Sequence, residues 1–126
     1  MGMNYRIDDA RRIVMTRGWG TISTRDLQDL TSRILVDPRF DPSYRSLADL
    51  SEVTEVLVNT MSMAETATAP LFVLGTRRAI VAAADHVHEM ASTFAAFSMR
   101  AGHEVRIFRR MPDAEAWLDS GDGAGD

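Results

Sequence analysis

A run of five apolar residues without a polar interruption, Ala79 to Ala83, constrains the fold more than any other feature of this chain. A strand with one face in water alternates apolar and polar residues, whereas a continuous run predicts a strand that is buried on both faces. Such strands occur in parallel sheets with helices packed on both sides. We therefore expect an α/β domain with residues 79–83 in its central sheet.

The first third of the chain carries clear strand and helix signals. Residues 3–7 and 13–20 are separated by a polar break, which predicts an antiparallel hairpin ending at its second glycine. The sequence Ser23–Asp26 has the form of a capping box and predicts the start of a helix. This helix must end before Asp37, because a proline follows that residue.

The middle of the chain gives weaker signals. Residues 44–50 predict a strand, and residues 53–58 are ambiguous. Ser62–Glu65 has the form of a second capping box, which predicts a short helix ending before Pro70. The apolar segment 71–74 is too short for a helix and is either a strand or an apolar loop.

The last third predicts two helices and a strand. A long helix is expected from a cap at Asp85 to residue 101, with Gly102 as its C-cap. Residues 105–108 predict a strand, and Pro112 occupies the favoured first position of a final helix. The glycine-rich segment 121–126 has no apolar residue of any size to bury, so we expect a disordered tail.

Strands that alternate with helices after a hairpin predict a mixed β-sheet packed with helices. The sheet is expected to be antiparallel at its start and parallel at residues 44–50, 79–83 and 105–108. We expect a single domain over residues 1–120.

The composition excludes several classes of protein. The 126 residues include no cysteine, which removes disulfides, thiol nucleophiles and zinc sites built on cysteine. A net charge of −4 argues against an extended nucleic-acid surface, so we expect no nucleic-acid partner. No apolar stretch approaches the roughly 20 residues that span a bilayer, and the N-terminus lacks a secretory signal. We therefore expect a cytoplasmic protein with no membrane span.

No motif in the sequence indicates a cofactor or a reaction. Gly18-Trp19-Gly20 lacks the third glycine and the lysine of a phosphate-binding loop, and there is no nucleophile elbow. His86, His88 and Glu89, with His103, suggest a metal site, but helix positions two apart point away from each other. We expect no cofactor, no metal and no catalytic residues.

Two sets of polar residues are candidates for ligand binding. Asp49, Ser51 and Asp85 are expected near the carboxyl ends of parallel strands, where open α/β sheets usually bind their ligands. Turn and helix capping is the more ordinary role for these carboxylates. The arginine pairs 11–12, 77–78 and 109–110 each flank a predicted strand, and they are either solvated or bind an anion.

Two apolar surfaces leave alternatives open. On the long helix the core face is predicted from Val87, Met90, Phe94, Phe97 and Ala101. The opposite side carries a stripe of His88, Ser92, Ala95 and Met99, which is either an alanine-rich solvent face or a contact surface for a second copy or another protein. Leu71, Phe72 and Leu74 belong either to the core or to an apolar lid over a pocket.

The segment Leu47–Thr54 contains Asp-Leu-Ser-x-Val-Thr, and in this it resembles STAS domains, the anti-sigma-factor-antagonist fold. The resemblance is closer to the uncharacterised bacterial SpoIIAA-like branch and extends over nearly the whole chain. It rests on the order of short motifs, namely Asn4–Ile7, Trp19-Gly20, Asp37–Pro42, Arg77–Val81 and Ala116–Leu118.

This resemblance implies a STAS-like α/β fold and a regulatory role. STAS antagonists carry a phosphorylatable hydroxyl in a turn that opens a helix, and the nearest hydroxyls here are Thr60 and Ser62. The Asp-Ser-Ser-Gly-like turn itself is absent. The architecture also resembles the CRAL-TRIO lipid-transfer fold, which implies a pocket for a lipid-like ligand lined by residues 71–74, Met61 and Met63.

The leading hypothesis is therefore a non-enzymatic binding module that acts through protein-protein contact, as a homodimer and with a possible regulatory protein partner. The alternative is a carrier or sensor of a small apolar or anionic ligand, bound at Asp49, Ser51, Leu71, Phe72 and Leu74. An enzyme that uses Asp49 or Asp85 is the least favoured class.

Overall fold

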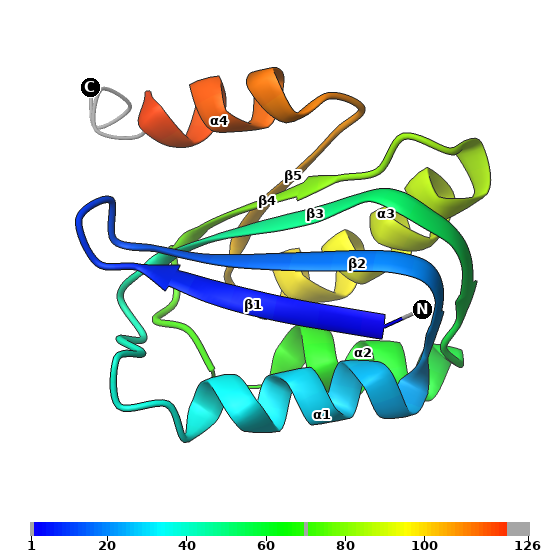
Figure 1. The fold of residues 1–126 in the computed structure, drawn as a ribbon, viewed down its shortest axis with the longest axis horizontal. Coiled ribbons are helices and arrows are strands. Elements are labelled where there is room, and N and C mark those ends of the chain that lie inside the picture. Colours follow the sequence, from blue (N-terminus) through cyan, green and yellow to red (C-terminus); the bar gives the residue numbers. More distant parts are fainter. Residues whose placement is uncertain (1, 70, 121–126) are drawn as a thin grey trace.

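The computed structural model describes residues 2–69 and 71–120. Within these residues the chain forms a five-stranded sheet of order β1-β2-β3-β4-β5 and four helices (Figure 1). In chain order the elements are β1 (Gly2–Asp8), β2 (Ile13–Ser23), α1 (Thr24–Leu35), β3 (Arg45–Leu57), α2 (Thr60–Thr68), β4 (Arg77–Val81), α3 (Asp85–Arg100), β5 (Glu104–Phe108) and α4 (Met111–Asp119).

The sheet is mixed, as the sequence predicts. β1 and β2 form an antiparallel hairpin in which Ile7 lies opposite Val14. All other neighbours, β2 with β3, β3 with β4 and β4 with β5, are parallel. The α/β class and the antiparallel start of the sheet are therefore confirmed.

β3 is much longer than predicted, and this corrects the expected strand end near residue 50. It extends unbroken from Arg45 to Leu57, through the ambiguous residues 53–58 as far as Leu57. β4 accompanies β3 only from Ser46 to Asp49, whereas β2 pairs with β3 as far as Leu57. The distal part of β3 therefore extends beyond β4 with β2 as its partner.

β2 also continues past the glycines at which it was expected to end. Its register against β3 shifts between Arg17 and Trp19 and again after Gly20, and the strand ends at Ser23. Gly18 lies beneath the side chains of this curled end: a Cβ atom there would lie 2.8 Å from Ile22 Cδ1 and 3.2 Å from Val53 Cγ2. The missing side chain lets β2 bend over itself.

Helices cover the two faces of the sheet unequally. α4 lies alone on one face, and α1, α2 and α3 lie on the other (Figure 1). The α4 face has its own buried cluster of Ile13, Leu47, Ala79, Val81, Ala114, Trp117 and Leu118. The other face packs separate clusters against α1 and against α2 and α3. Ala79 to Val81 in β4 are buried for this reason. The predicted run 79–83 extends too far, since β4 ends at Val81 and Ala83 is exposed.

Arginines hold α4 on its face of the sheet. Arg77 donates to the carbonyl oxygen of Trp117 at 2.9 Å, and Arg45 donates to that of Leu118. These carbonyls belong to the last turn of α4, where the helix itself supplies no donors. The Trp117 ring also has the guanidinium carbon of Arg77 at 4.8 Å and that of Arg106 at 5.4 Å from its centre.

Two predicted helix starts need correction. α2 begins at Thr60 rather than after Ser62, because the Asn59 side chain caps it by accepting from the Ser62 backbone N–H at 2.8 Å. α3 has Ala84 at its N-cap, and the Asp85 side chain binds Arg109 Nη1 at 2.6 Å instead of capping. The core face of α3 is also rotated from the prediction. Its fully buried residues are Val87, Ala91, Ala95 and Ser98, whereas Met90, Phe94 and Phe97 are only partly buried.

Two expectations concern residues outside the described ranges, namely the disordered tail at 121–126 and the role of Pro70 after α2. α2 itself ends at Thr68, and the apolar segment 71–74 forms a loop instead of a strand. No helix within the described residues is both long and apolar enough to cross a membrane.

The capping box of α1 provides a test of local stability. Ser23 Oγ accepts from the Asp26 N–H at 3.2 Å, and the Asp26 side chain accepts from the Ser23 N–H at 2.9 Å. We expect Ser23→Ala to lower the free energy of unfolding by about 1 kcal/mol, measured by urea denaturation. Ser32→Ala, at an exposed position inside α1, is the matched control and should be nearly neutral. Equal losses in both variants would contradict this role for the cap.

Candidate functional site

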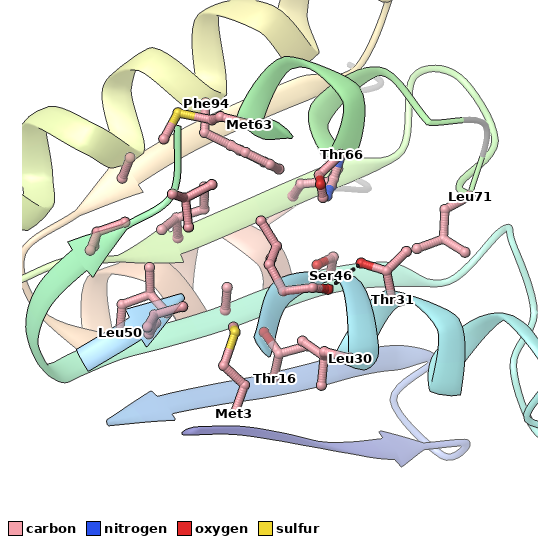
Figure 2. A pocket seen from close by; sticks show the side chains of 18 of the residues that line it. Met3, Thr16, Leu30, Thr31, Ser46, Leu50, Met63, Thr66, Leu71 and Phe94 are labelled. Atoms are coloured by element: carbon pink, nitrogen blue, oxygen red, sulfur yellow. Dashed lines mark hydrogen bonds between the residues drawn. The ribbon is translucent and has the colours of Figure 1, made fainter. Parts of the chain in front are cut away.

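An apolar cavity lies between the sheet and helices α1, α2 and α3. Its volume is about 150 Å³. Figure 2 shows side chains from strands and helices converging on this space. Its wall includes the aliphatic, methionine and aromatic side chains Met3, Val14, Ile22, Leu27, Leu30, Ile34, Leu50, Val56, Val58, Met63, Leu71, Phe72, Ile80, Val87, Met90 and Phe94. Concave apolar space with a few polar groups is typical of small-molecule sites.

The lining follows from the two-residue period of the strands. Side chains two apart on a strand share a face, so Ser46, Ala48 and Leu50 of β3 all line the cavity. The same alternation brings Arg78 and Ile80 of β4 to this face. The curled end of the β2-β3 pair closes the far side with apolar residues, among them Ile22, Leu50 and Val56.

Most of the polar side chains gather at one end, whereas Thr16 lies opposite Ala48, nearer the middle of the wall. Ser46 and Arg78 are direct neighbours in the β3-β4 pairing, near the start of both strands. Figure 2 shows Thr31, Ser46 and Thr66 on the side of Leu71, away from Leu50. The hydroxyl of Thr31 donates to the Leu27 carbonyl at 2.9 Å, and that of Thr66 donates to the Ser62 carbonyl at 3.0 Å.

Among the described residues, Arg78 is the only charged one in the cavity wall. Its guanidinium carbon lies 4.9 Å from the centre of the Phe72 ring and 5.5 Å from that of Phe94. Within residues 2–69 and 71–120 its side chain makes neither an ion pair nor a hydrogen bond. Burial lowers the pKa of Arg78 to about 10, so the group remains protonated at neutral pH.

The structure divides the predicted ligand residues between different surfaces. Leu71 and Phe72 line the cavity, but Leu74 is 67% exposed and packs beside Gly102. Asp49 lines a shallower hollow on the opposite face of the sheet, and Ser51 donates to its carboxylate from both N and Oγ, at 3.0 and 2.6 Å. The prediction that these five residues form one site is therefore wrong. Side chains alternate between the two faces of a strand, so Asp49, between the cavity-facing Ala48 and Leu50, points to the opposite face.

The candidate phosphoacceptors lie at the start of α2. Thr60 is exposed, and Ser62 is half-buried with its backbone N–H bound to the Asn59 side chain. The neighbouring methionines separate: Met63 lines the cavity, whereas Met61 is 73% exposed and lies outside it.

The histidines lie apart from each other. His86 contacts the Thr54 carbonyl, and His103 is buried, with its pKa lowered first by burial and then by the charge of Arg78. Asp85, a candidate ligand residue, has its pKa lowered by the hydrogen bond from Arg109. Among the described residues, no group of three His, Asp or Glu side chains is placed to hold a metal ion.

The predicted stripe on α3 is not continuous. Met99 is 52% exposed and Ser92 is exposed, but Ala95 is only 4% exposed and packs in the core. His88 is half-buried. The expectation that Ala95 lies on an exposed contact surface is wrong, because Ala95 belongs to the buried side of α3 together with Val87, Ala91 and Ser98.

The most perturbed carboxylate lies outside the cavity, at the end of α1. Asp37 accepts from Arg39 Nη2 at 2.9 Å and from the Tyr5 hydroxyl at 2.6 Å. These bonds, Arg39 first, hold the pKa of Asp37 far below its usual range and raise that of Tyr5. The cluster ties the segment after α1 to β1 and has a structural role.

Comparison with known proteins identifies the fold. No family model and no curated protein sequence matches the chain. Among solved structures it is similar to the crystal structure of an uncharacterised protein of the DUF3478 family, with a SpoIIAA-like fold, from Shewanella loihica PV-4. The TM-score is 0.62 at 16% sequence identity, over 93% of this chain and 94% of the other. The predicted SpoIIAA-like fold is therefore confirmed. An identity this low carries no statement about activity.

The Asp37 cluster predicts a dependence of stability on pH. Since its pKa is lowered on folding, the ionised carboxylate stabilises the protein above the unfolded pKa of about 3.9, and this contribution is lost as the pH falls through the folded pKa. We expect Asp37→Asn to be less stable than wild type at pH 7, with a difference that shrinks below about pH 4. Urea denaturation at a series of pH values measures this difference.

The control is Asp29→Asn, since Asp29 makes only an exposed pair with Arg33 at 3.3 Å. Its effect at pH 7 should be small. A difference between wild type and Asp37→Asn that stayed constant down to pH 2 would show that Asp37 does not act through its charge.

Proposed function

We propose that this chain is a non-enzymatic binding module that carries or senses a small apolar molecule in the cavity under α1, α2 and α3. The observation that supports the proposal is the cavity itself, which has a largely apolar wall and most of its polar groups toward one end. Each methylene that a ligand moves from water into such a wall stabilises the complex by about 0.8 kcal/mol. A flexible chain of methylenes therefore matches the wall better than a compact polar molecule.

The chemistry of the lining supports binding more than catalysis. A general acid or base needs a pKa near the working pH. The ionisable group in the wall is Arg78, which stays charged at neutral pH. The hydroxyls of Thr31 and Thr66 already donate to backbone carbonyls. These side chains can hold and orient a molecule, and we assign them no part in a reaction.

Blocking the cavity tests this function. We expect wild type to bind 1-decanol, an uncharged amphiphile, with a Kd that isothermal titration calorimetry can measure. Ala48→Leu places a larger side chain in the centre of the cavity floor, so binding should fall at least tenfold while the fold is retained.

Ala96→Leu is the matched control, because Ala96 is exposed on α3 and does not line the cavity. This variant should bind as wild type does. Failure of wild type to bind 1-decanol or any alkyl-chain ligand, or equal binding by Ala48→Leu, would refute the proposed function.

A second candidate function, contact between two copies of the chain, is favoured by an exposed apolar tip. We define this tip as Val73, Leu74 and Met99, which are 52%, 67% and 52% exposed. The two segments that carry it meet where the Gly75 N–H donates to the Gly102 carbonyl at 3.0 Å. Large apolar side chains gathered on a surface are a common feature of protein interfaces.

Oligomeric state tests this second function. If two copies associate through the tip, wild type should elute as a dimer in size-exclusion chromatography with light scattering, and Met99→Glu should be a folded monomer. Thr93→Glu, at an exposed position elsewhere on α3, should leave the dimer intact. A wild-type monomer at high micromolar concentration would exclude the homodimer.

A further inference from the structure

The cavity is polarised along the strands of the sheet. Its polar end lies at the start of β3 and β4, where Ser46 and Arg78 are paired neighbours. Its other end is formed by the curled part of β2 and β3 and by α3, with Ile22, Val56 and Val87. A ligand that fills this space must therefore be amphiphilic, with its polar atoms beside Arg78 and its apolar part toward the curl.

Two hydrogen-bond donors at the polar end have no acceptor among the described residues. Ser46 is only 7% exposed, yet among the described residues its hydroxyl makes no hydrogen bond. Arg78 lies between two aromatic rings and is equally without a partner in these residues. Arg78 is half-buried, and a charge in an apolar wall without a partner is costly. The donors of both groups are reached from the cavity, since the one fully enclosed side-chain polar atom without a partner in the described residues is His103 Nδ1. Both groups therefore lack an acceptor that a ligand would supply.

We propose that the cavity binds an alkyl carboxylate, with its carboxylate held by Arg78 and Ser46 and its hydrocarbon chain directed toward Ile22 and Val56. This inference rests on the proposed function and adds the class of ligand and its orientation.

The charge at the site favours a carboxylate over other heads. A guanidinium offers two parallel N–H donors that match the two oxygens of a carboxylate, and the Ser46 hydroxyl adds a third donor beside them. Arg78 is the single charge that residues 2–69 and 71–120 bring to the wall, so one negative charge neutralises it. A phosphate monoester carries about −1.5 to −2 at neutral pH and would bring uncompensated charge into an apolar wall.

The hydroxyls of Thr31 and Thr66 do not donate hydrogen bonds to the carboxylate. Thr31 and Thr66 have committed their protons to the carbonyls of Leu27 and Ser62, so they offer only lone pairs to a ligand. Lone pairs repel a carboxylate oxygen and attract a donor. The carboxylate is therefore directed to Arg78 and Ser46 rather than to the two threonines.

The experiment compares ligands that share a chain and differ in head group. Decanoate, 1-decanol and decyl phosphate are titrated into the full chain at pH 7.5 by isothermal titration calorimetry. We expect decanoate to bind about 10- to 100-fold more tightly than 1-decanol, the range given by hydrogen bonds to a charged group. Decyl phosphate should bind more weakly than decanoate. Lengthening the carboxylate from octanoate to decanoate should tighten binding by about fourfold per methylene.

The variants assign the preference to its residues. Arg78→Leu should lose the preference for decanoate over 1-decanol. Arg106→Leu is the matched control, since Arg106 also lies over an aromatic ring, that of Trp117 on the opposite face, at 5.4 Å. It should keep the preference. Ser46→Ala and Arg78→Lys should each retain a reduced preference, and these milder changes keep the test available if Arg78→Leu does not fold.

The outcomes separate this inference from the proposed function. Wild type that binds decanoate and 1-decanol equally, or a preference that survives in Arg78→Leu, would overturn the inference and leave the proposed function standing. Tighter binding of decyl phosphate than of decanoate would overturn the assignment of a carboxylate. A protein that binds none of the alkyl ligands would overturn both.

Discussion

The absence of a side chain at Gly18 is the constraint on which the candidate site depends. A Cβ atom there would lie 2.8 Å from Ile22 Cδ1 and 3.3 Å from Leu50 Cδ2, too close for an unchanged packing. Without it, β2 shifts register and curls. The distal half of β3 curls with it, because in the described residues that half pairs with β2 and not with β4. This curled pair forms the apolar end of the cavity. Because β2 bends, the sheet and its helices enclose a cavity instead of packing flat against each other.

The two arginines that begin β4 show how one residue type serves two environments. Arg77 points to the α4 face, where it pairs with Glu104 at 3.4 Å and donates to the Trp117 carbonyl. Arg78, one residue later, points to the other face and lies over the rings of Phe72 and Phe94. The first arginine fastens a helix. The second leaves a charge in an apolar wall, a cost that the aromatic faces offset only in part.

Much of the architecture could be predicted from local signals, because those signals act over a few residues. The capping box at Ser23, the apolar run of β4 and the proline at the start of α4 all identify their elements. The length of β3 could not be predicted, since its distal half is exposed and polar on one side and depends on the curl of β2 for a partner. Leu71, Phe72 and Met63 were predicted to line a pocket, but its charged residue was missed. Arg78 was interpreted as a residue flanking a strand, whereas its spacing of two from Ile80 was the signal that it faces inward.

The sheet divides the core into two parts, and substitutions in one part can be tolerated independently of the other. The cluster against α4 and the wall of the cavity lie on opposite faces and share few side chains. Substitutions that have no partner in common usually add in their effects on stability. Substitutions in the cavity wall can therefore change which ligand binds while the cluster against α4 continues to stabilise the fold.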